Sequence, residues 1–237
     1  EEINRRVTDA LSDVLLCTEK SAVKNLRHEG VSDHQVFFVG NLMIDTLQKN
    51  RQKAAASDVL DRLGLQQRGY GVLTLHRPSN VDDPSTLGRL LEAVEEIQND
   101  LPLVFPAHPR TRHVLETGPF GERVRAMPNL RLIPPAGYLD FLHLMDRAQF
   151  VLTDSGGIQE ETTILSVPCL TLRENTERPI TVEMGTNQLV GTDSQRILAA
   201  YRDVRQGKLP AATVPPLWDG RAAERIVELL GGLSLRS

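Results

Sequence analysis

The chain has 237 residues, of which 40% are hydrophobic and 24% charged, so it can bury a sizeable core in one or two globular domains. Its formal net charge of −4 and its aromatic content of 4% argue against nucleic acid as a partner, because such proteins need basic surfaces and stacking platforms. No apolar run approaches the length of a membrane span and no charged-then-apolar leader opens the chain, so we expect no membrane partner.

The two cysteines indicate the cellular compartment of the protein, and the first residues indicate whether the sequence is a whole chain. Cys17 and Cys169 lie in apolar, strand-like runs that are typical of reduced, buried thiols, which suits a cytoplasmic protein. Glu1 leads directly into an amphipathic helical pattern with no initiator Met and no capping residue ahead of it. We therefore interpret the sequence as a piece cut from a longer chain.

Short apolar or β-branched runs alternate with helical patterns along almost the whole chain, which predicts an α/β protein with parallel strands joined by crossover helices. In chain order, the predicted strands are residues 14–17, 36–39, 71–75, 103–106, 130–133, 150–153, 168–172 and 188–190. The clearest predicted helices are residues 2–12, 21–28, 42–55, 57–63, 85–99, 138–147, 157–165, 194–205 and 221–230. A domain junction is predicted near Gly40 and Asn41, and a softer boundary in the proline-rich connector 209–216.

The most informative stretch is residues 149–161, where an apolar strand stops at a polar corner and a helical pattern begins. Gly156 and Gly157 let backbone N–H groups approach an anion, and a helix N-terminus adds partial positive charge there. We call Ser155, Gly156 and Gly157 the glycine corner. Glu161, about one turn into the helix, is spaced to accept hydrogen bonds from the hydroxyls of a sugar attached to that phosphate. The combination predicts a nucleotide or nucleotide-sugar site, although the short string is equally typical of a plain turn with Ser155 as N-cap.

Polar side chains follow four of the predicted strands, at the edge where an open parallel sheet binds its ligands. They belong to residues 76–80, 107–110, 154–157 and 173–179. Arg178 offers a planar cationic fork for phosphate oxygens, and His76 offers a proton donor that titrates near neutral pH. The sequence therefore predicts an anion-binding site at this edge.

Two other kinds of site fit these residues less well. His76 and His108 come without the cysteine or carboxylate spacing of a zinc centre, so we expect no metal. A serine hydrolase would use Ser155, but the G-x-S-x-G elbow is missing. Asp154 before the serine and two glycines after it fit a phosphate cradle better than an exposed nucleophile.

With these residues, the sequence resembles the non-hydrolysing UDP-N-acetylglucosamine 2-epimerases of bacteria and archaea. The resemblance runs over essentially the whole chain, through residues 1–5, 38–41, 73–77, 152–161, 177–179, 189–192 and 219–220. It implies a glycosyltransferase B type fold, in which two Rossmann-like domains face each other and the second holds most of the UDP. Residues 1–41 would then be the end of the N-terminal domain, 42–215 the C-terminal UDP-binding domain, and 216–237 a C-terminal helix packing back on the first domain.

The resemblance also implies an activity. Members of the family invert C2 of UDP-N-acetylglucosamine (UDP-GlcNAc) to give UDP-N-acetylmannosamine (UDP-ManNAc), for cell-surface polysaccharide biosynthesis in the cytoplasm. UDP is eliminated to leave a 2-acetamidoglucal and is then added back, a course that asks for acid-base carboxylates near C2 and for groups that hold the departing UDP. No external cofactor is implied, and the full-length protein is expected to form a homodimer.

The binding residues carry over by motif. Ser155, Gly156 and Gly157 resemble the family's diphosphate cradle. Glu161 resembles its ribose-binding carboxylate, and Arg178 resembles its substrate-binding arginine.

Three further residues carry over with a role in catalysis or base binding. His76 matches the histidine implicated in UDP binding and catalysis, and Glu1 matches a catalytic carboxylate. Phe141 is similar to a residue near the uracil. Glu1 also has a structural reason at a helix start, and an aromatic residue at the helical spacing of Phe141 is as often part of a core.

The family's other catalytic carboxylates and an early substrate-binding arginine belong to the first domain, most of which this sequence lacks. We therefore expect the chain alone to bind UDP weakly and to be inactive or weak as a catalyst, because the missing half also excludes water. Two alternatives stay open, a UDP-sugar glycosyltransferase of the same fold and a non-catalytic nucleotide-sugar-binding domain.

Overall fold

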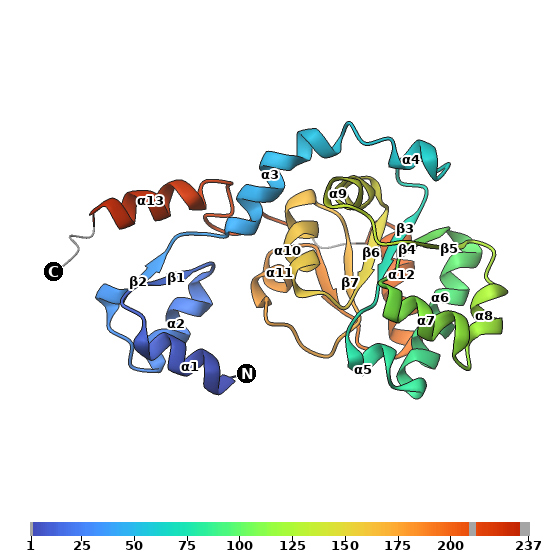
Figure 1. Ribbon diagram of the computed structural model, residues 1–237, viewed down its shortest axis with the longest axis horizontal. Helices are drawn as coiled ribbons and strands as arrows, with labels where there is room; N and C mark the ends of the chain where they lie inside the picture. Colours follow the sequence, from blue (N-terminus) through green and yellow to red (C-terminus); the bar gives the residue numbers. More distant parts are fainter. Residues whose placement is uncertain (1, 209–211, 233–237) are drawn as a thin grey trace. The chain divides into compact units, whose positions relative to one another are not determined.

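The computed structural model describes residues 2–208 and 212–232 of the chain (Figure 1). The chain divides into two compact units: unit 1 takes residues 1–49 and 214–237, and unit 2 takes residues 50–213. The boundary at Lys49 lies inside helix α3 (Leu42–Ala54), whereas the sequence predicts a junction near Gly40 and Asn41. Equating the units with domains of a longer protein stays a prediction.

Unit 1 contains a small parallel sheet and the helices around it. Its elements are α1 (Glu2–Leu11), β1 (Leu15–Cys17), α2 (Lys20–His28), the 3₁₀ turn η1 (Asp33–Gln35), β2 (Val36–Phe38), the first part of α3, and α13 (Ala222–Gly232). The strands pair in parallel with Leu15 opposite Val36. Leu15, Cys17 and Leu26 form the buried core beneath them.

The C-terminal segment of unit 1 is tied to the segment that follows β1 and β2. The indole Nε1 of Trp218 donates to the carbonyl of Thr18 at 2.9 Å, and Arg225 donates to the carbonyl of Val39 at 3.1 Å. Gly40 adopts a φ of +90°, and a Cβ there would lie 2.1 Å from the Leu217 carbonyl oxygen. Only glycine allows the two segments to approach so closely.

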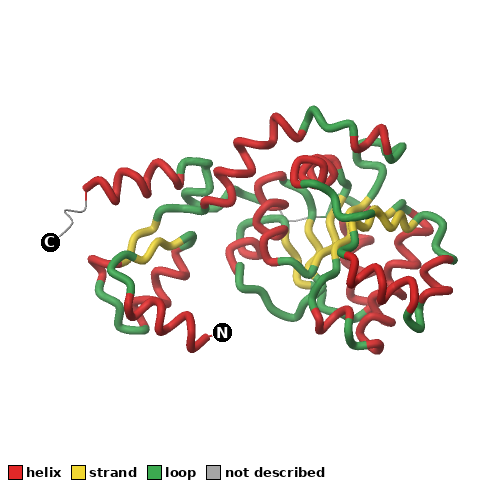
Figure 2. Tube along the Cα trace, in the orientation of Figure 1, coloured by secondary structure: helices red, strands yellow, loops and turns green. Residues whose placement is uncertain are grey.

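Unit 2 is built on a six-stranded parallel sheet, shown as yellow strands in Figure 2. The strands in spatial order are β5 (Leu130–Ile133), β4 (Leu103–Pro106), β3 (Gly71–Thr74), β6 (Phe150–Thr153), β7 (Cys169–Thr171) and β8 (Asn187–Leu189). Numbered within the unit, this order is 3-2-1-4-5-6, the doubly wound arrangement of dinucleotide-binding folds. The predicted α/β class and parallel sheet are confirmed.

Helices cover both faces of this sheet. The helices that lie wholly within unit 2 are α4 (Val59–Arg62), α5 (Pro78–Val81), α6 (Pro84–Asp100), α7 (Pro109–Thr117), α8 (Gly121–Arg125), α9 (Tyr138–Arg147), α10 (Gly156–Leu165), α11 (Pro179–Glu183) and α12 (Ser194–Arg205). Helices α6 and α12 pack together, as do α9 and α10, and the two pairs flank the sheet in Figure 1. None of the helices within residues 2–208 and 212–232 combines the length and hydropathy that crossing a bilayer requires.

The apolar strands β3 and β6 form the centre of the unit 2 core. Leu73, Phe150 and Leu152 are essentially inaccessible to solvent, and the ring of Phe150 meets that of Tyr201 edge-on at 5.3 Å. Gly71 begins β3 in this crowded region. A Cβ there would lie 2.7 Å from Phe150 Cζ and 2.8 Å from Leu103 Cδ2, so glycine is required by packing.

We expect Gly71→Ala to lower the free energy of unfolding by about 1–3 kcal/mol, because the added methyl group overpacks a filled core. Urea unfolding followed by far-UV circular dichroism measures the change. Gly231→Ala in α13 is the control, since a Cβ at that position meets nothing within 4 Å and the change should leave stability unchanged or raise it by up to about 1 kcal/mol. Equal stability of the Gly71 variant and the parent would contradict this account of the core.

Candidate functional site

The candidate site lies where the strand order of unit 2 reverses, between β3 and β6. In open α/β sheets, ligands bind beyond the carboxyl ends of the strands at such a point. Thr74 of β3 pairs with Thr153 of β6. The residues that follow, His76 and Asp154, therefore emerge side by side, although 78 positions separate them in the chain.

The glycine corner forms the N-terminus of α10. Ser155 is the N-cap residue with extended backbone angles, and its N–H donates to Thr153 Oγ1 at 3.0 Å. Its hydroxyl makes no capping hydrogen bond within the part of the chain that the structure describes. The first N–H groups of a ten-residue helix, together with this hydroxyl, therefore remain available to an anion.

Gly156 keeps the approach to this helix end open. A Cβ built on Gly156 would find Glu177 Oε2 at 3.9 Å as its nearest neighbour, which is an ordinary van der Waals distance. The φ of Gly156 is not in the left-handed region. Neither packing nor backbone conformation requires glycine here, whereas a ligand that approaches the main chain would.

Asp154 does not face the glycine corner, as a cradle residue would, but binds the segment after β3. It is fully buried and accepts hydrogen bonds from the backbone N–H of His76 at 3.1 Å and of Arg77 at 2.9 Å. The amide of Asn80 donates to it at 3.2 Å. The ring nitrogen Nδ1 of His76 lies 2.7 Å from Asp154 Oδ1, and the ring is otherwise half exposed.

The contact between His76 and Asp154 shifts the pKa of each group in the direction that favours an ion pair. Burial alone would raise the pKa of Asp154, but the hydrogen bonds from the His76 ring and the Arg77 backbone outweigh it and bring that pKa below its usual range. The pKa of His76 is raised, chiefly by its hydrogen bond to Asp154 and against the opposing effects of desolvation and Arg77. His76 therefore stays protonated to a higher pH than an exposed histidine.

Glu161 is buried one turn into α10. Burial is the main reason that its pKa rises to about 7, and the neighbouring carboxylate of Glu160 adds to the rise. The hydroxyl of Tyr138 at the start of α9 lies 3.5 Å from Glu161 Oε1 and acts in the opposite direction. Phe141, three residues further along α9, is half buried.

Arg178 precedes α11 and is held by the other buried carboxylate of α10. Its Nε lies 2.8 Å from Glu160 Oε1, and its side chain is 41% exposed. The structure thus places Ser155, Gly156, Gly157, Glu161 and Arg178 on or against the first turns of α10, with His76 at the end of the neighbouring strand. Glu1 lies outside the described residues.

Two arginines of the predicted anion-binding edge, Arg77 and Arg173, receive no individual role from the sequence. Arg173 is buried and binds Glu177 through two hydrogen bonds of 2.7 and 2.6 Å, and Arg77 approaches the same carboxylate at 3.4 Å. The bond from Arg173 is the main reason that the pKa of Glu177 falls to about 2. Arg77 and Arg173 also line an adjoining cavity of about 290 Å³.

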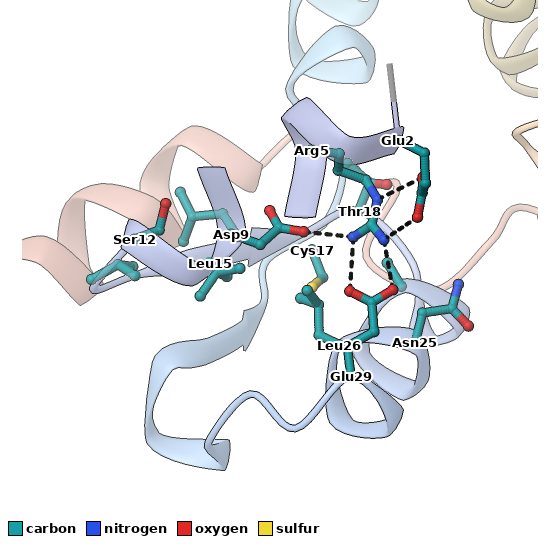
Figure 3. Close-up of a pocket in the computed structure, with 13 residues that line it drawn as sticks. Glu2, Arg5, Asp9, Ser12, Leu15, Cys17, Thr18, Asn25, Leu26 and Glu29 are labelled. Atoms are coloured by element: carbon teal, nitrogen blue, oxygen red, sulfur yellow. Dashed lines mark hydrogen bonds and ion pairs between the residues drawn. The ribbon is translucent and has the colours of Figure 1, made fainter. Parts of the chain in front are cut away.

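A second cavity, larger than the one beside Arg77 and Arg173, lies in unit 1. It measures about 580 Å³ and is lined by α1, β1 and α2 (Figure 3). Arg5 projects into it and binds Glu2, Asp9 and Glu29 at 2.6 Å each, so its charged groups satisfy one another. No predicted site residue described by the structure lines it. In the described part of the chain, no group of three or more His, Cys, Asp or Glu side chains is arranged to hold a metal ion.

Comparison with known proteins identifies the family. Residues 1–231 match the family model of UDP-N-acetylglucosamine 2-epimerase. The chain belongs to the UDP-N-acetylglucosamine 2-epimerase family. A 2-epimerase of that name from Methanocaldococcus jannaschii is 38% identical over 97% of this chain and 64% of the relative.

One solved structure and one further relative bear on fold and substrate. The crystal structure of the M. jannaschii UDP-GlcNAc 2-epimerase in complex with UDP-GlcNAc and UDP matches 98% of this chain and 64% of that chain, with a TM-score of 0.86 and 37% identity. The UDP-2,3-diacetamido-2,3-dideoxy-D-glucuronate 2-epimerase of Pseudomonas aeruginosa is 38% identical over 98% of this chain and 64% of the relative. The chain thus spans less than two thirds of the relatives that it matches.

We expect Glu161→Gln to flatten the dependence of stability on pH. Because the folded pKa of about 7 lies above that of an unfolded glutamate, folded Glu161 binds a proton more tightly, and its contribution to stability is lost as pH rises toward and through 7. The variant should gain on the parent between pH 5 and pH 8, by at most about 3 kcal/mol. Urea unfolding across this range measures the difference.

Glu96→Gln on the exposed surface of α6 controls for the carboxylate-to-amide change. Parallel pH profiles for parent and Glu161→Gln would show that Glu161 titrates as an ordinary surface carboxylate and would contradict the burial argument.

Proposed function

We propose that this chain is the UDP-binding part of a non-hydrolysing epimerase that interconverts UDP-GlcNAc and UDP-ManNAc. The observation that carries the proposal is the match of residues 1–231 to the epimerase family. A similar crystal structure, that of the M. jannaschii enzyme, is a complex with UDP-GlcNAc and UDP. This membership disfavours the glycosyltransferase alternative. The N-terminus of α10 is open at the point where the strand order reverses, and such a helix end binds the phosphate groups that a UDP-sugar carries.

In the proposed complex, the diphosphate binds the N-terminus of α10 at the glycine corner, near the cation of Arg178. Gly156 supports this role because nothing in the protein fills the space where its side chain would be. Glu161 accepts hydrogen bonds from the ribose hydroxyls. Because Glu161 is buried, these hydrogen bonds are stronger than they would be in water. Phe141, one turn beyond Tyr138, lies against the uracil.

The proposed reaction begins with loss of the C2 proton and rupture of the bond from C1 to UDP. The products are 2-acetamidoglucal and UDP; addition of UDP at C1 and of a proton at the opposite face of C2 completes the isomerisation. His76 donates a hydrogen bond to the departing diphosphate, and Glu1 is one of the carboxylates for the proton at C2. No redox change accompanies the reaction, so no cofactor is invoked.

The chain corresponds to only part of the length of its relatives, which limits what it does alone. It covers 64% of the M. jannaschii enzyme. We propose that residues 1–41 are the end of an N-terminal domain, 42–215 the UDP-binding domain, and 216–237 a helix that packs back on the first domain. The remaining third then supplies further carboxylates and excludes water, and the complete protein acts in the cytoplasm as a homodimer. The free, buried thiols of Cys17 and Cys169 suit that compartment.

The sugar itself is the least constrained part of the proposal. The P. aeruginosa relative is as similar to this chain as the M. jannaschii enzyme, and its name specifies a 2,3-diacetamido glucuronate. Both names describe the same inversion at C2 of a UDP-linked sugar. Substrate competition between UDP-GlcNAc and the UDP-linked uronate decides between them.

We expect UDP to bind this chain more tightly than UMP, because only the diphosphate spans the helix end and Arg178. Gly156→Ala should lower UDP affinity about tenfold, since its methyl group occupies the approach to the α10 N-terminus, while the melting temperature is unchanged or slightly raised. Arg178→Ala should cause a comparable loss. Isothermal titration calorimetry measures these affinities.

Arg205→Ala is the matched control for the arginine, because Arg205 binds Asp100 at the opposite edge of the sheet and should not affect UDP. Equal affinities for UDP and UMP in every variant would refute the glycine corner as the diphosphate site.

We also expect the chain alone to epimerise UDP-GlcNAc about 10²–10⁴-fold more slowly than a full-length member, the range that positioned acid-base groups contribute. Proton NMR in D₂O measures the rate, because inversion exchanges the hydrogen at C2. Conversion at a full-length rate would refute the assignment of the missing groups to the absent third. No conversion after the missing domain is supplied would favour a nucleotide-sugar-binding domain without catalysis.

A further inference from the structure

Asp154 has a position that phosphate binding does not explain. It directly precedes the glycine corner, but its carboxylate accepts two main-chain N–H groups, the Asn80 amide and the ring of His76. Asn80 is itself fixed, because its amide also donates to the Leu172 carbonyl at 3.1 Å. Three hydrogen bonds therefore fix the position of the Asp154 carboxylate independently of its contact with the imidazole of His76.

This rigid acceptor determines which nitrogen of His76 carries hydrogen. An ionised carboxylate can only accept, so Nδ1, at 2.7 Å from Asp154 Oδ1, must be the protonated nitrogen. Nε2 has no hydrogen-bond partner among residues 2–208 and 212–232, and the ring is 56% exposed. Nε2 is therefore the nitrogen that meets a ligand.

We propose that Asp154 is a positioning residue that acts through His76, fixing its Nδ1–H form and presenting Nε2 as a proton donor to the leaving diphosphate, so that His76 is not the base at C2. This inference rests on the proposed function. It assigns the carboxylate–imidazole pair to the departing UDP and leaves the proton at C2 to carboxylates.

The charges around the imidazole favour a donor over a base. Asp154 contacts the ring directly, whereas the nearest cation, Arg77, turns its Nε to the Asp154 carbonyl at 3.0 Å and approaches Glu177 with its outer nitrogen. An imidazolium is therefore stabilised before any ligand arrives, in agreement with the raised pKa of His76. A diphosphate adds further negative charge, whereas a base at C2 needs the neutral ring.

The competing interpretation is that Asp154 only ties the ends of β3 and β6 together. Both interpretations predict that loss of Asp154 harms the protein. They differ in what happens to the ring of His76 in the folded chain, and in whether the effects of substituting Asp154 and His76 on UDP binding are independent.

The first test is NMR spectroscopy of the unliganded chain with ¹⁵N-labelled histidine. Long-range ¹H–¹⁵N spectra over a pH titration report the tautomer and the pKa of each imidazole, and His76→Asn assigns the signals. We expect His76 to be protonated at Nδ1 in its neutral form, with a pKa above the usual value for histidine. A neutral ring protonated at Nε2, or a His76 pKa at or below the usual value for histidine, would overturn the proposal without any substitution at Asp154.

The second test is a double-mutant cycle on UDP affinity with Asp154→Asn and His76→Gln. If Asp154 acts through His76, each single variant lowers affinity about tenfold and the double variant loses little more. Additive losses would assign Asp154 to the fold alone and overturn the proposal. Asp100→Asn, which contacts Tyr201 and Arg205 at the opposite edge, is the control. A parent chain that binds no UDP would count against the proposed function, whereas the tautomer and pKa measured without ligand still decide the role of Asp154.

Discussion

The parallel pairing of β3 with β6 determines almost everything about the candidate site. Its register brings Thr74 beside Thr153, and the strand order reverses at this pair, so the connections after the two strands leave toward opposite faces of the sheet. The space beyond the strand ends is therefore free of a crossover. His76 and the glycine corner are neighbours only because of this pairing.

The site balances its charges before a ligand arrives. Asp154 binds the His76 ring, Glu160 binds Arg178, and Glu177 binds Arg173, so three carboxylates each hold a cation or an imidazole in place. Glu161 differs, because its hydrogen-bond donor is the neutral hydroxyl of Tyr138. A buried carboxyl with a neutral partner is well suited to exchange hydrogen bonds with hydroxyls, whereas the paired carboxylates orient the groups that meet phosphate.

Local patterns explain how much of this was predictable. Each of the strands β3 and β6 is a short unbroken apolar run, and the two glycines follow β6 within a few residues. The strands, the parallel sheet and the helix start at Gly156 can therefore be predicted from local sequence. The contact of Asp154 with His76 depends on strand order, which no local pattern encodes, so the sequence alone assigns Asp154 to the phosphate cradle. The helix α7 was missed as a distinct element, although Pro109 in its first turn is a recognised start signal.

The composition of unit 1 has a consequence for how the chain is made. Trp218 and Arg225 join Thr18 and Val39 across about 200 positions of sequence, so unit 1 is discontinuous and unit 2 is inserted within it. During synthesis from the N-terminus, all of unit 2 leaves the ribosome before the segment that completes unit 1. Unit 2, with the glycine corner, can therefore fold co-translationally before residues 214–237 reach unit 1. A stop codon placed directly after unit 2 would deprive unit 1 of Trp218 and Arg225 while sparing the sheet that carries the site.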